Sequence, residues 1–328
     1  FDRQRRIGGR CAVLAELDVG GRPLGVASIH LENRTHGEGR RLQLEAVLRA
    51  AEELLPGIPV VLGGDLNTNT FDGRSKEDIG DIAGSTYEFN NTSDYNFPMF
   101  AHGSSFTDDT VCTIAVADAI LSCTDYQTSL RTWCRKYPYP MGGYGEYFFN
   151  WFKRRDPRPY NSFGNGSAMR VSPIGWLFGC ENEVRKQAEL SAAITHNHPE
   201  GIKGAVAAAT AIFRMRTEKI KSPSIFEQVA KEFYGSDAFL NLPRRGVFDG
   251  SCQSCVPLAL HLASLATSFE DAVRLAVSYG GDSDTMGAIV GSLAEAQYEI
   301  PLGMTSRAKS YLSKDMLEVV EQFEKSKK

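Results

Sequence analysis

The segment Gly280-Gly281-Asp282-Ser283-Asp284-Thr285 stands directly before apolar residues at helical spacing, and it places two carboxylates at the start of the expected helix. The segment Phe106-Thr107-Asp108-Asp109-Thr110 precedes an earlier helical stretch in the same way. Capping explains one Asp, Ser or Thr at a helix start, but each motif holds more carboxylates than one cap uses. Four carboxylates brought together would repel one another unless cations neutralised them, and oxygen-only ligands select hard ions such as Mg²⁺, Mn²⁺ or Ca²⁺. The two motifs therefore predict a binuclear metal site.

The chain around these motifs has the pattern of a helical protein. After Ile79 the apolar residues recur at helical spacing in one segment after another, with few credible strands. The clearest expected helices cover residues 111–122, 181–193, 203–215, 224–233, 255–266, 269–278 and 285–297.

The front of the chain has a different pattern. Two extended segments, residues 11–19 and 24–31, flank the turn Gly20-Gly21, and a helix over residues 42–55 leads to a short buried strand at residues 60–62. There are ten Arg and one Lys before Ile79, against thirteen Arg and twelve Lys from there on. We therefore predict a small α+β fragment over residues 1–78, followed by a mainly all-α domain over residues 79–328.

The front fragment resembles part of the endonuclease/exonuclease/phosphatase family. The resemblance rests on His30 at the end of the second strand and on Gly63-Gly64-Asp65-Leu66-Asn67 after the third. In that family such a His contacts the scissile phosphate, and the Asp-x-Asn pair orients a water molecule. The metal-binding Glu and the closing Ser-Asp-His of the family have no counterpart here, so we interpret residues 1–78 as an incomplete fragment without nuclease activity.

Composition narrows the classes of partner. A formal net charge of -4 provides no general attraction for a nucleic-acid backbone, so we expect no such partner. No stretch is long and apolar enough for a membrane span, and the first ten residues do not have the pattern of a signal peptide. Seven scattered cysteines suit a reducing compartment, and Cys252-x-x-Cys255 is interpreted as two packed thiols. We expect a cytoplasmic monomer.

Five motifs in order make residues 79–328 resemble the ADP-ribosylglycohydrolase family, whose type member reverses arginine ADP-ribosylation in a nitrogenase-regulating system. The two metal motifs are joined by the opening Gly80-Asp81-Ile82-Ala83-Gly84-Ser85-Thr86-Tyr87-Glu88, by the glycine-rich segment 160–170, and by the segment 195–200. The resemblance implies a compact helical domain with a central cleft for two metal ions. It also implies hydrolysis of the bond at the anomeric carbon of the distal ribose of ADP-ribose.

The resemblance assigns roles to individual residues. Two Mg²⁺, or Mn²⁺ in their place, would be bound by Thr107, Asp108, Asp109, Asp282, Asp284 and Thr285. The expected catalytic residues are Glu88, Asp109 and Asp282, with Glu88 assisting proton transfer or gating substrate entry. The expected substrate-binding residues are Asn165, Gly166, Ser167, Met169 and His196.

Physical reasons support some of these assignments. Small residues over 164–167 would let backbone amides approach a pyrophosphate and form an anion nest. His198 could be a second ligand-binding residue or a structural one. The aromatic segment 139–149 could form an adenine wall or belong to the core.

Several alternatives stay open at the level of sequence. An ADP-ribose-binding module would keep the pocket without turnover, a two-carboxylate glycosidase would need no metal, and a metal-dependent phosphodiesterase or phosphatase would release other products. The acceptor would be an ADP-ribosylated protein or small molecule, with arginine favoured. One departure from the family pattern concerns Arg74-Ser75-Lys76-Glu77-Asp78, which replaces an apolar turn and could loosen the segment that holds Glu88.

Overall fold

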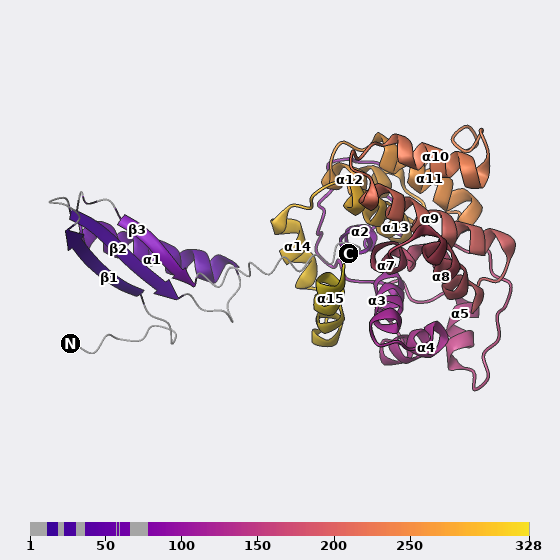
Figure 1. The fold of residues 1–328 in the computed structure, drawn as a ribbon, viewed down its shortest axis with the longest axis horizontal. Helices are drawn as coiled ribbons and strands as arrows, with labels where there is room; N and C mark the ends of the chain where they lie inside the picture. Colours follow the sequence, from indigo (N-terminus) through magenta and orange to yellow (C-terminus); the bar gives the residue numbers. More distant parts are fainter. Residues whose placement is uncertain are drawn as a thin grey trace. The chain divides into compact units, whose positions relative to one another are not determined.

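The computed structural model describes residues 12–18, 23–30, 37–56, 58, 60–65 and 78–327 of the chain. It divides into two compact units, Phe1–Asp72 and Gly73–Lys328. Figure 1 shows a small sheet with one helix in the first unit and helices throughout the second.

The first unit is built around a three-stranded sheet. Its elements are β1 (Ala12–Asp18), β2 (Pro23–His30), α1 (Gly37–Leu54) and β3 (Val60–Asp65). The strands lie in the order β1-β2-β3, with β2 antiparallel to β1 and parallel to β3. This confirms the predicted β-β-α-β pattern. The third strand is longer than predicted, because Gly63, Gly64 and Asp65 pair with β2 and do not follow the strand. The register sets His30 opposite Asp65, whereas the turn Gly20-Gly21 and Asn67 lie outside the described residues.

The second unit is helical. Its first helices are α2 (Asp78–Gly84), α3 (Asp108–Leu121), α4 (Tyr126–Lys136), α5 (Glu146–Lys153), α6 (Gly166–Met169), α7 (Ser172–Leu177) and α8 (Glu181–Ala193). They are followed by α9 (Pro199–Thr217), α10 (Ser224–Tyr234), α11 (Cys252–Leu265), α12 (Phe269–Tyr279), α13 (Ser283–Gln297), α14 (Leu302–Lys309) and α15 (Lys314–Ser326). Within residues 78–327, isolated β-bridges join Thr107 to Met141 and Gly164 to Ser251. The predicted mainly all-α class is confirmed.

Helix α13 forms the centre of this unit. It packs against α2, α9, α11 and α12, and its residues from Ser283 to Ala296 are buried (Figure 1). A helix buried on all sides needs small residues where neighbouring backbones approach closely. A Cβ added to Gly80 of α2 would lie 1.9 Å from the carbonyl oxygen of Gly287 of α13. Glycine at both positions therefore lets α2 lie directly against α13.

Helix α2 is short, yet it is anchored. Ile79, Ile82 and Ala83 are fully buried, so the one apolar residue kept at the junction does enter the core. Beyond the helix, Asn91 donates hydrogen bonds to the carbonyl oxygens of Tyr87 (2.7 Å), Glu88 (3.0 Å) and Gly281 (3.0 Å). The amide of Gly281 donates to Asn91 Oδ1 at 2.7 Å. These contacts tie the Glu88 segment to the start of α13.

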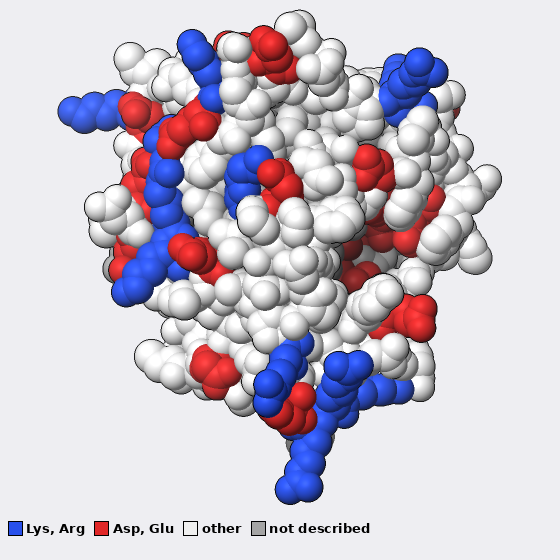
Figure 2. Space-filling model, turned by 90° about the vertical axis from the view of Figure 1, so that its right-hand side faces the viewer, with Lys and Arg blue, Asp and Glu red and all other residues white. Residues whose placement is uncertain are grey.

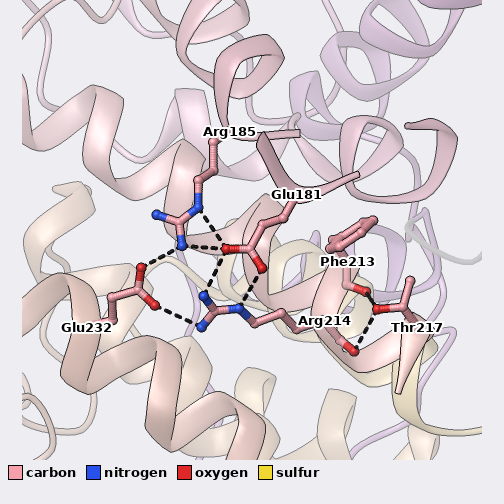
Figure 3. Close-up of polar contacts among 6 residues, drawn as sticks. All are labelled: Glu181, Arg185, Phe213, Arg214, Thr217 and Glu232. Carbon is pink, nitrogen blue, oxygen red and sulfur yellow. Dashed lines mark hydrogen bonds and ion pairs between the residues drawn. The ribbon is translucent and has the colours of Figure 1, made fainter. Parts of the chain in front are cut away.

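A network of four charged side chains joins three helices on another part of this unit. Figure 3 shows Glu181 and Arg185 of α8, Arg214 of α9 and Glu232 of α10 with their groups facing one another. Arg185 Nη2 lies 2.6 Å from Glu181 Oε1, and Arg214 Nη1 lies 2.8 Å from Glu232 Oε2. Because each cation contacts both carboxylates, removal of one side chain leaves its partners without full compensation.

Candidate metal centre and pocket

The carboxylates of the site come from three helices and the residues next to them. Asp81 lies in the middle of α2, Asp109 and Asp284 are the second residues of α3 and α13, Asp282 precedes α13 and Glu88 follows α2. Oxygen atoms of Asp81, Asp109 and Asp284 all lie within 4.8 Å of one another, and so do those of Glu88, Asp282 and Asp284. The structure thus brings the two predicted motifs together across 170 residues of sequence and adds two carboxylates from the opening motif.

Hydrogen bonds hold one side of three of the carboxylates, those of Asp81, Asp109 and Asp282. The amides of Thr107 and Thr110 donate to Asp81 Oδ2 at 2.9 and 3.2 Å, and the Thr110 hydroxyl donates to the same atom. Thr285 Oγ1 donates to Asp109 Oδ2 at 3.1 Å. Asn165 Nδ2 donates to Asp282 Oδ2 at 2.7 Å. These contacts fix the orientation of the three carboxylates, but they use only some of the hydrogen bonds that the carboxylate oxygens can accept.

Other carboxylate oxygens of the cluster have no hydrogen-bond donor within the described part of the chain. Asp81 Oδ1, Glu88 Oε2, Asp109 Oδ1 and Asp284 Oδ1 are buried and have no hydrogen-bond donor among the residues that the structure describes. A buried carboxylate oxygen without a donor is costly, and several of them around one point indicate a cation as the missing partner. The cluster therefore fits the divalent metal that the sequence predicted.

The raised pKa values of the carboxyl groups also indicate a site for cations. Burial, and then the charges of Asp81 and Asp108, raise the pKa of Asp109 well above its ordinary value. Burial, and then the charge of Asp109, raise the pKa of Asp284 in the same direction. Burial together with Asp282 and Asp81 raises the pKa of Glu88 to about 7. Cations would relieve this repulsion, and an all-oxygen donor set selects hard divalent ions.

A pocket opens beside the acidic cluster. It has a volume of about 460 Å³, which is within the range of small-molecule sites. Glu88, Asp108, Asp282, Asp284 and Thr285 line it from the side of the cluster. Figure 2 shows a face of the molecule with a hollow in which acidic side chains are visible.

The predicted metal ligands occupy different places in this arrangement. Asp282, Asp284 and Thr285 line the pocket, and Asp109 is buried within the cluster. Asp108 lines the pocket but belongs to neither group of three carboxylates. Thr107 is fully buried and caps α3, since its Oγ1 accepts a hydrogen bond from the Asp109 amide at 3.2 Å.

The predicted substrate-binding residues also line the pocket, with one exception. Asn165, Gly166, Met169 and His196 line the pocket. Ser167 does not, because its buried hydroxyl donates to the carbonyl oxygen of Gly201 at 2.7 Å. The Ser167 side chain therefore holds α6 against α9 and does not face the pocket.

The glycine-rich segment differs from the predicted anion nest. The Gly164 amide donates to Ser162 Oγ at 3.1 Å, and the Asn165 amide donates to the Gly250 carbonyl at 2.7 Å. Both donors are used within the protein, so the nest prediction is wrong at these two positions. The small size of Gly166 has another reason, because a Cβ there would lie 3.2 Å from His196 Nε2.

The remaining alternatives can be compared with the structure. His198 precedes α9 and its Nδ1 accepts a hydrogen bond from the Glu200 amide at 3.1 Å, so this histidine is an N-cap and does not line the pocket. The aromatic segment contributes to the pocket and to the core: Tyr144, Tyr147 and Phe148 line the pocket, and Phe148 is also buried in the core. That the segment forms an adenine wall stays a prediction. Cys252 and Cys255 are buried free thiols, as the interpretation as packed thiols required.

Sequence reasoning missed several residues of the site. Asp81 was quoted as part of the opening motif but was not assigned to the metal site, although it stands beside Asp109 and Asp284. Its position next to Gly80, the residue in closest contact with α13, was the available signal. Tyr160, Arg170 and Phe248 also line the pocket. Nothing in the local sequence distinguishes Phe248 from other exposed aromatic residues.

The fold and the site define a class of protein: a helical domain with a buried carboxylate cluster suited to metal at one side of a small-molecule pocket. Residues 78–326 match the sequence profile of the ADP-ribosylglycohydrolase family. The chain belongs to the ADP-ribosylglycohydrolase family. The match begins at residue 78, so the resemblance of the front fragment to nucleases remains a prediction.

Individual relatives agree with this membership. ADP-ribosyl-[dinitrogen reductase] glycohydrolase of Rhodospirillum rubrum is 26% identical over 260 residues, a match that covers 70% of this chain and 86% of that protein. ADP-ribosylhydrolase ARH3 of Gallus gallus is 28% identical over 142 residues, which covers 38% of this chain and 39% of that protein. An uncharacterized protein of Archaeoglobus fulgidus is 31% identical over 154 residues, and the match covers 42% of this chain but only half, 50%, of that protein.

A solved structure also resembles the chain. The ADP-ribosylglycohydrolase-related protein complex superposes with a TM-score of 0.58 at 24% identity, covering 76% of this chain and 94% of the other. At this level of identity the likeness shows the fold. Within the described residues, no helix combines the length and the apolar character that crossing a membrane requires.

Proposed function

We propose that this protein is a metal-dependent hydrolase that removes ADP-ribose from ADP-ribosylated acceptors by cleaving the bond at the anomeric carbon of the distal ribose. The observation that carries the proposal is the set of buried carboxylate oxygens without donors, Asp81 Oδ1, Glu88 Oε2, Asp109 Oδ1 and Asp284 Oδ1, gathered beside a pocket of about 460 Å³. Family membership supports the substrate class, and the names of the bacterial and avian relatives both refer to ADP-ribose.

The metal would be held by the acidic cluster. Asp81, Asp109, Asp282 and Asp284 would supply carboxylates, with Thr107, Asp108 and Thr285 beside them. When bound, divalent cations would neutralise these charges and fix the hydroxyl groups of the distal ribose. Two Mg²⁺ remain our proposal for their number and identity, with Mn²⁺ as the alternative, and two carboxylate triads that share Asp284 support it.

The residues of this chain would do the remaining work. Asn165 orients Asp282 through the 2.7 Å hydrogen bond, so that the carboxylate faces the pocket in one position. We propose that Glu88 exchanges a proton with the leaving atom of the cleaved bond or with the attacking water. Its position on the pocket, with an oxygen that has no donor among the described residues, supports this role. His196, Met169 and Gly166 would contact the part of ADP-ribose that extends away from the cluster.

The most specific part of the proposal concerns the acceptor, the group to which ADP-ribose is linked in the substrate. We propose arginine as the first linkage to test, because the family's type member acts on arginine and the Rhodospirillum rubrum relative matches 70% of this chain. Relatives that carry the name ADP-ribosylhydrolase ARH3 are of similar identity, so serine-linked and polymeric ADP-ribose belong in the same panel. We also propose that residues 79–328 form the hydrolase domain and that it acts in the cytoplasm.

The test is product analysis across that panel. The full chain is incubated with arginine-linked, serine-linked and polymeric ADP-ribose in the presence of Mg²⁺, and the products are identified by mass spectrometry. We expect intact ADP-ribose from at least one substrate, and none from the Asp282→Ala variant. Release of inorganic phosphate or of AMP would contradict cleavage at the anomeric carbon. Binding of ADP-ribose without any release would establish a binding module in place of an enzyme.

A further inference from the structure

Three buried side chains form a line of hydrogen bonds that ends at His196, and two of them, Arg170 and His196, also line the pocket. Arg170 Nη2 donates to the carbonyl oxygen of Ser191 at 3.1 Å and to Thr195 Oγ1 at 2.9 Å. Thr195 Oγ1 lies 2.7 Å from His196 Nδ1. The exposed fractions are 1% for Arg170, 0% for Thr195 and 4% for His196, so water does not compete for these contacts.

The directions of the hydrogen bonds follow from what each group can donate. An arginine guanidinium only donates, so Thr195 Oγ1 accepts from Arg170. The one hydroxyl hydrogen of Thr195 is then available, and His196 Nδ1 is the acceptor in reach. The reverse arrangement, with a proton on Nδ1, would leave the hydroxyl hydrogen without an acceptor among the described residues, which is costly in a buried place.

The ring of His196 is held in position as well as in protonation. Its backbone amide donates to the Ala192 carbonyl at 2.8 Å at the end of α8. Gly201 and Gly166 leave just enough room for the ring, because added Cβ atoms would lie 3.0 Å from His196 Cβ and 3.2 Å from His196 Nε2. Nε2 is the ring nitrogen near the pocket-lining residues Gly164 and Gly166, and no hydrogen bond joins it to a described residue.

We propose that Arg170 and Thr195 are positioning residues that fix His196 as the neutral tautomer with its proton on Nε2, so that this N–H donates to an acceptor oxygen of the substrate. A neutral imidazole with Nδ1 occupied as an acceptor must carry its proton on Nε2. This role of Arg170 and Thr195 rests on the proposed function only for the identity of the substrate, ADP-ribose. The acceptor oxygen belongs to a phosphate or to a hydroxyl group of ADP-ribose.

The charges around the ring support a neutral histidine. Burial, and then the charge of Arg170, lower the pKa of His196 well below its ordinary value. Arg170 forms no ion pair with a carboxylate in the part of the chain that the structure describes, so its charge is not cancelled nearby. Tyr160 is a titratable group beside the ring, with 6.1 Å between ring centroids, and burial raises its pKa to about 12. Both neighbours therefore keep their charge state through the neutral range.

The first measurement is the tautomer itself, by long-range ¹H–¹⁵N NMR on the histidine-labelled full chain without substrate. The His196 signals are assigned by their loss in His196→Gln. We expect Nδ1 to have the ¹⁵N chemical shift of an unprotonated nitrogen and Nε2 that of a protonated one. Both shifts should stay unchanged between pH 6 and 8, although a free histidine titrates at about 6.5. A proton on Nδ1, or a charged ring at neutral pH, would overturn the proposal.

Variants then separate positioning from simple packing. Thr195→Val keeps the shape and removes the hydroxyl, whereas Thr195→Ser keeps the hydroxyl. The matched control is Thr210→Val, since Thr210 is equally buried and its hydroxyl has no hydrogen-bond partner among the described residues. We expect Thr195→Val to shift His196 towards the other tautomer, and Thr195→Ser and Thr210→Val to leave the tautomer as in the wild type. If Thr195→Val does not fold, Arg170→Met tests the other end of the line by the same spectrum.

Binding connects the tautomer to the substrate. Loss of one well-placed hydrogen bond should weaken ADP-ribose about fivefold to tenfold in Thr195→Val by calorimetry, and raise KM with kcat within about twofold. Titration with adenosine, AMP and ADP separates the acceptors: a loss that appears with AMP or ADP but not with adenosine identifies a phosphate oxygen, and a loss already present with adenosine identifies a hydroxyl of its ribose. A loss seen with ADP-ribose alone identifies a hydroxyl of the distal ribose. Equal affinity in the two Thr195 variants would contradict the proposal. A wild-type chain that binds no ADP-ribose would refute the proposed function, and the NMR result would still decide the tautomer.

Discussion

Replacement of Gly84 by alanine should separate the stability of the fold from the integrity of the metal site. Gly84 ends α2 at the point where α13 begins, and an added Cβ would lie 2.3 Å from the Ser283 carbonyl oxygen and 2.5 Å from Asp284 Cα. Ordinary carbon contacts are about 3.5 Å or longer, so the two backbones would have to separate by roughly 1 Å. No side-chain rotation relieves the contact, because the neighbouring atoms are backbone atoms.

The expected cost can be estimated from two opposing effects. Overpacking of this kind costs about 1–3 kcal/mol, and the better helix propensity of alanine returns about 0.5–1 kcal/mol. We expect a net loss of about 1–2 kcal/mol in the free energy of unfolding. The effect on metal binding should be larger than this loss suggests, because Asp81 and Asp284 lie on the two helices that move apart.

The assay is urea unfolding together with thermal unfolding at increasing Mg²⁺. The wild type should gain stability with the cation, by about 2.7 kcal/mol at a hundred times the dissociation constant. Gly84→Ala should unfold at lower urea and lose most of this gain. The matched control is Gly303→Ala in α14, where an added Cβ meets nothing within 4 Å, and it should be neutral or slightly stabilising. Unfolding at the wild-type urea concentration with the full Mg²⁺ effect would refute the reasoning.

Three further changes test other parts of the account. Asp284→Asn removes one of several mutually repelling buried charges, so the metal-free protein should melt higher than the wild type, while the Mg²⁺-dependent gain in thermal unfolding should disappear. Asn91→Ala releases the Glu88 segment and should lower kcat about tenfold in an ADP-ribose release assay. The control variant Asn90→Ala, at the exposed neighbouring residue, should keep the wild-type kcat. Glu181→Gln should cost about 1–3 kcal/mol in urea unfolding at pH 7, because hydrogen bonds from Arg214 hold the pKa of Glu181 below its ordinary 4.5. The lowered pKa of Glu181 stabilises the folded protein at pH values above the pKa of the unfolded chain, and this stabilisation is lost as the pH falls. The difference in free energy of unfolding between Glu181→Gln and the wild type should therefore shrink below about pH 4.5.

The helical part of the fold was predictable where periodicity and capping agree. Helix α8 has the predicted bounds, Glu181–Ala193, and α13 starts two residues before the predicted Thr285. Helix α9 begins four residues earlier than predicted, because His198 caps it and Pro199 fits the first turn. Apolar spacing alone does not show such a start, since Ile202 is the one large apolar residue of the first turn.

The site was predictable at its carboxylates and less so behind them. Asp109, Asp282 and Asp284 could be found because charged residues at a helix start are conspicuous in sequence. Ser167 was assigned to the substrate but faces Gly201, because the direction of a side chain in a short helix depends on what packs behind it. The line from Arg170 to His196 could not be predicted, since it joins residues from two segments whose distance the sequence does not give.

The most direct test of the central claim is the release of free ADP-ribose from an arginine-ADP-ribosylated protein, followed in time for the wild-type chain and for Asp284→Asn. Each is measured with Mg²⁺ and with excess chelator. The account predicts release by the wild type with Mg²⁺, and a rate lower by at least about a hundredfold with chelator or in Asp284→Asn, because several kcal/mol of transition-state stabilisation depend on the occupied site. Release that continues at the wild-type rate in chelator, or in Asp284→Asn, would contradict a metal-dependent hydrolase built on these carboxylates.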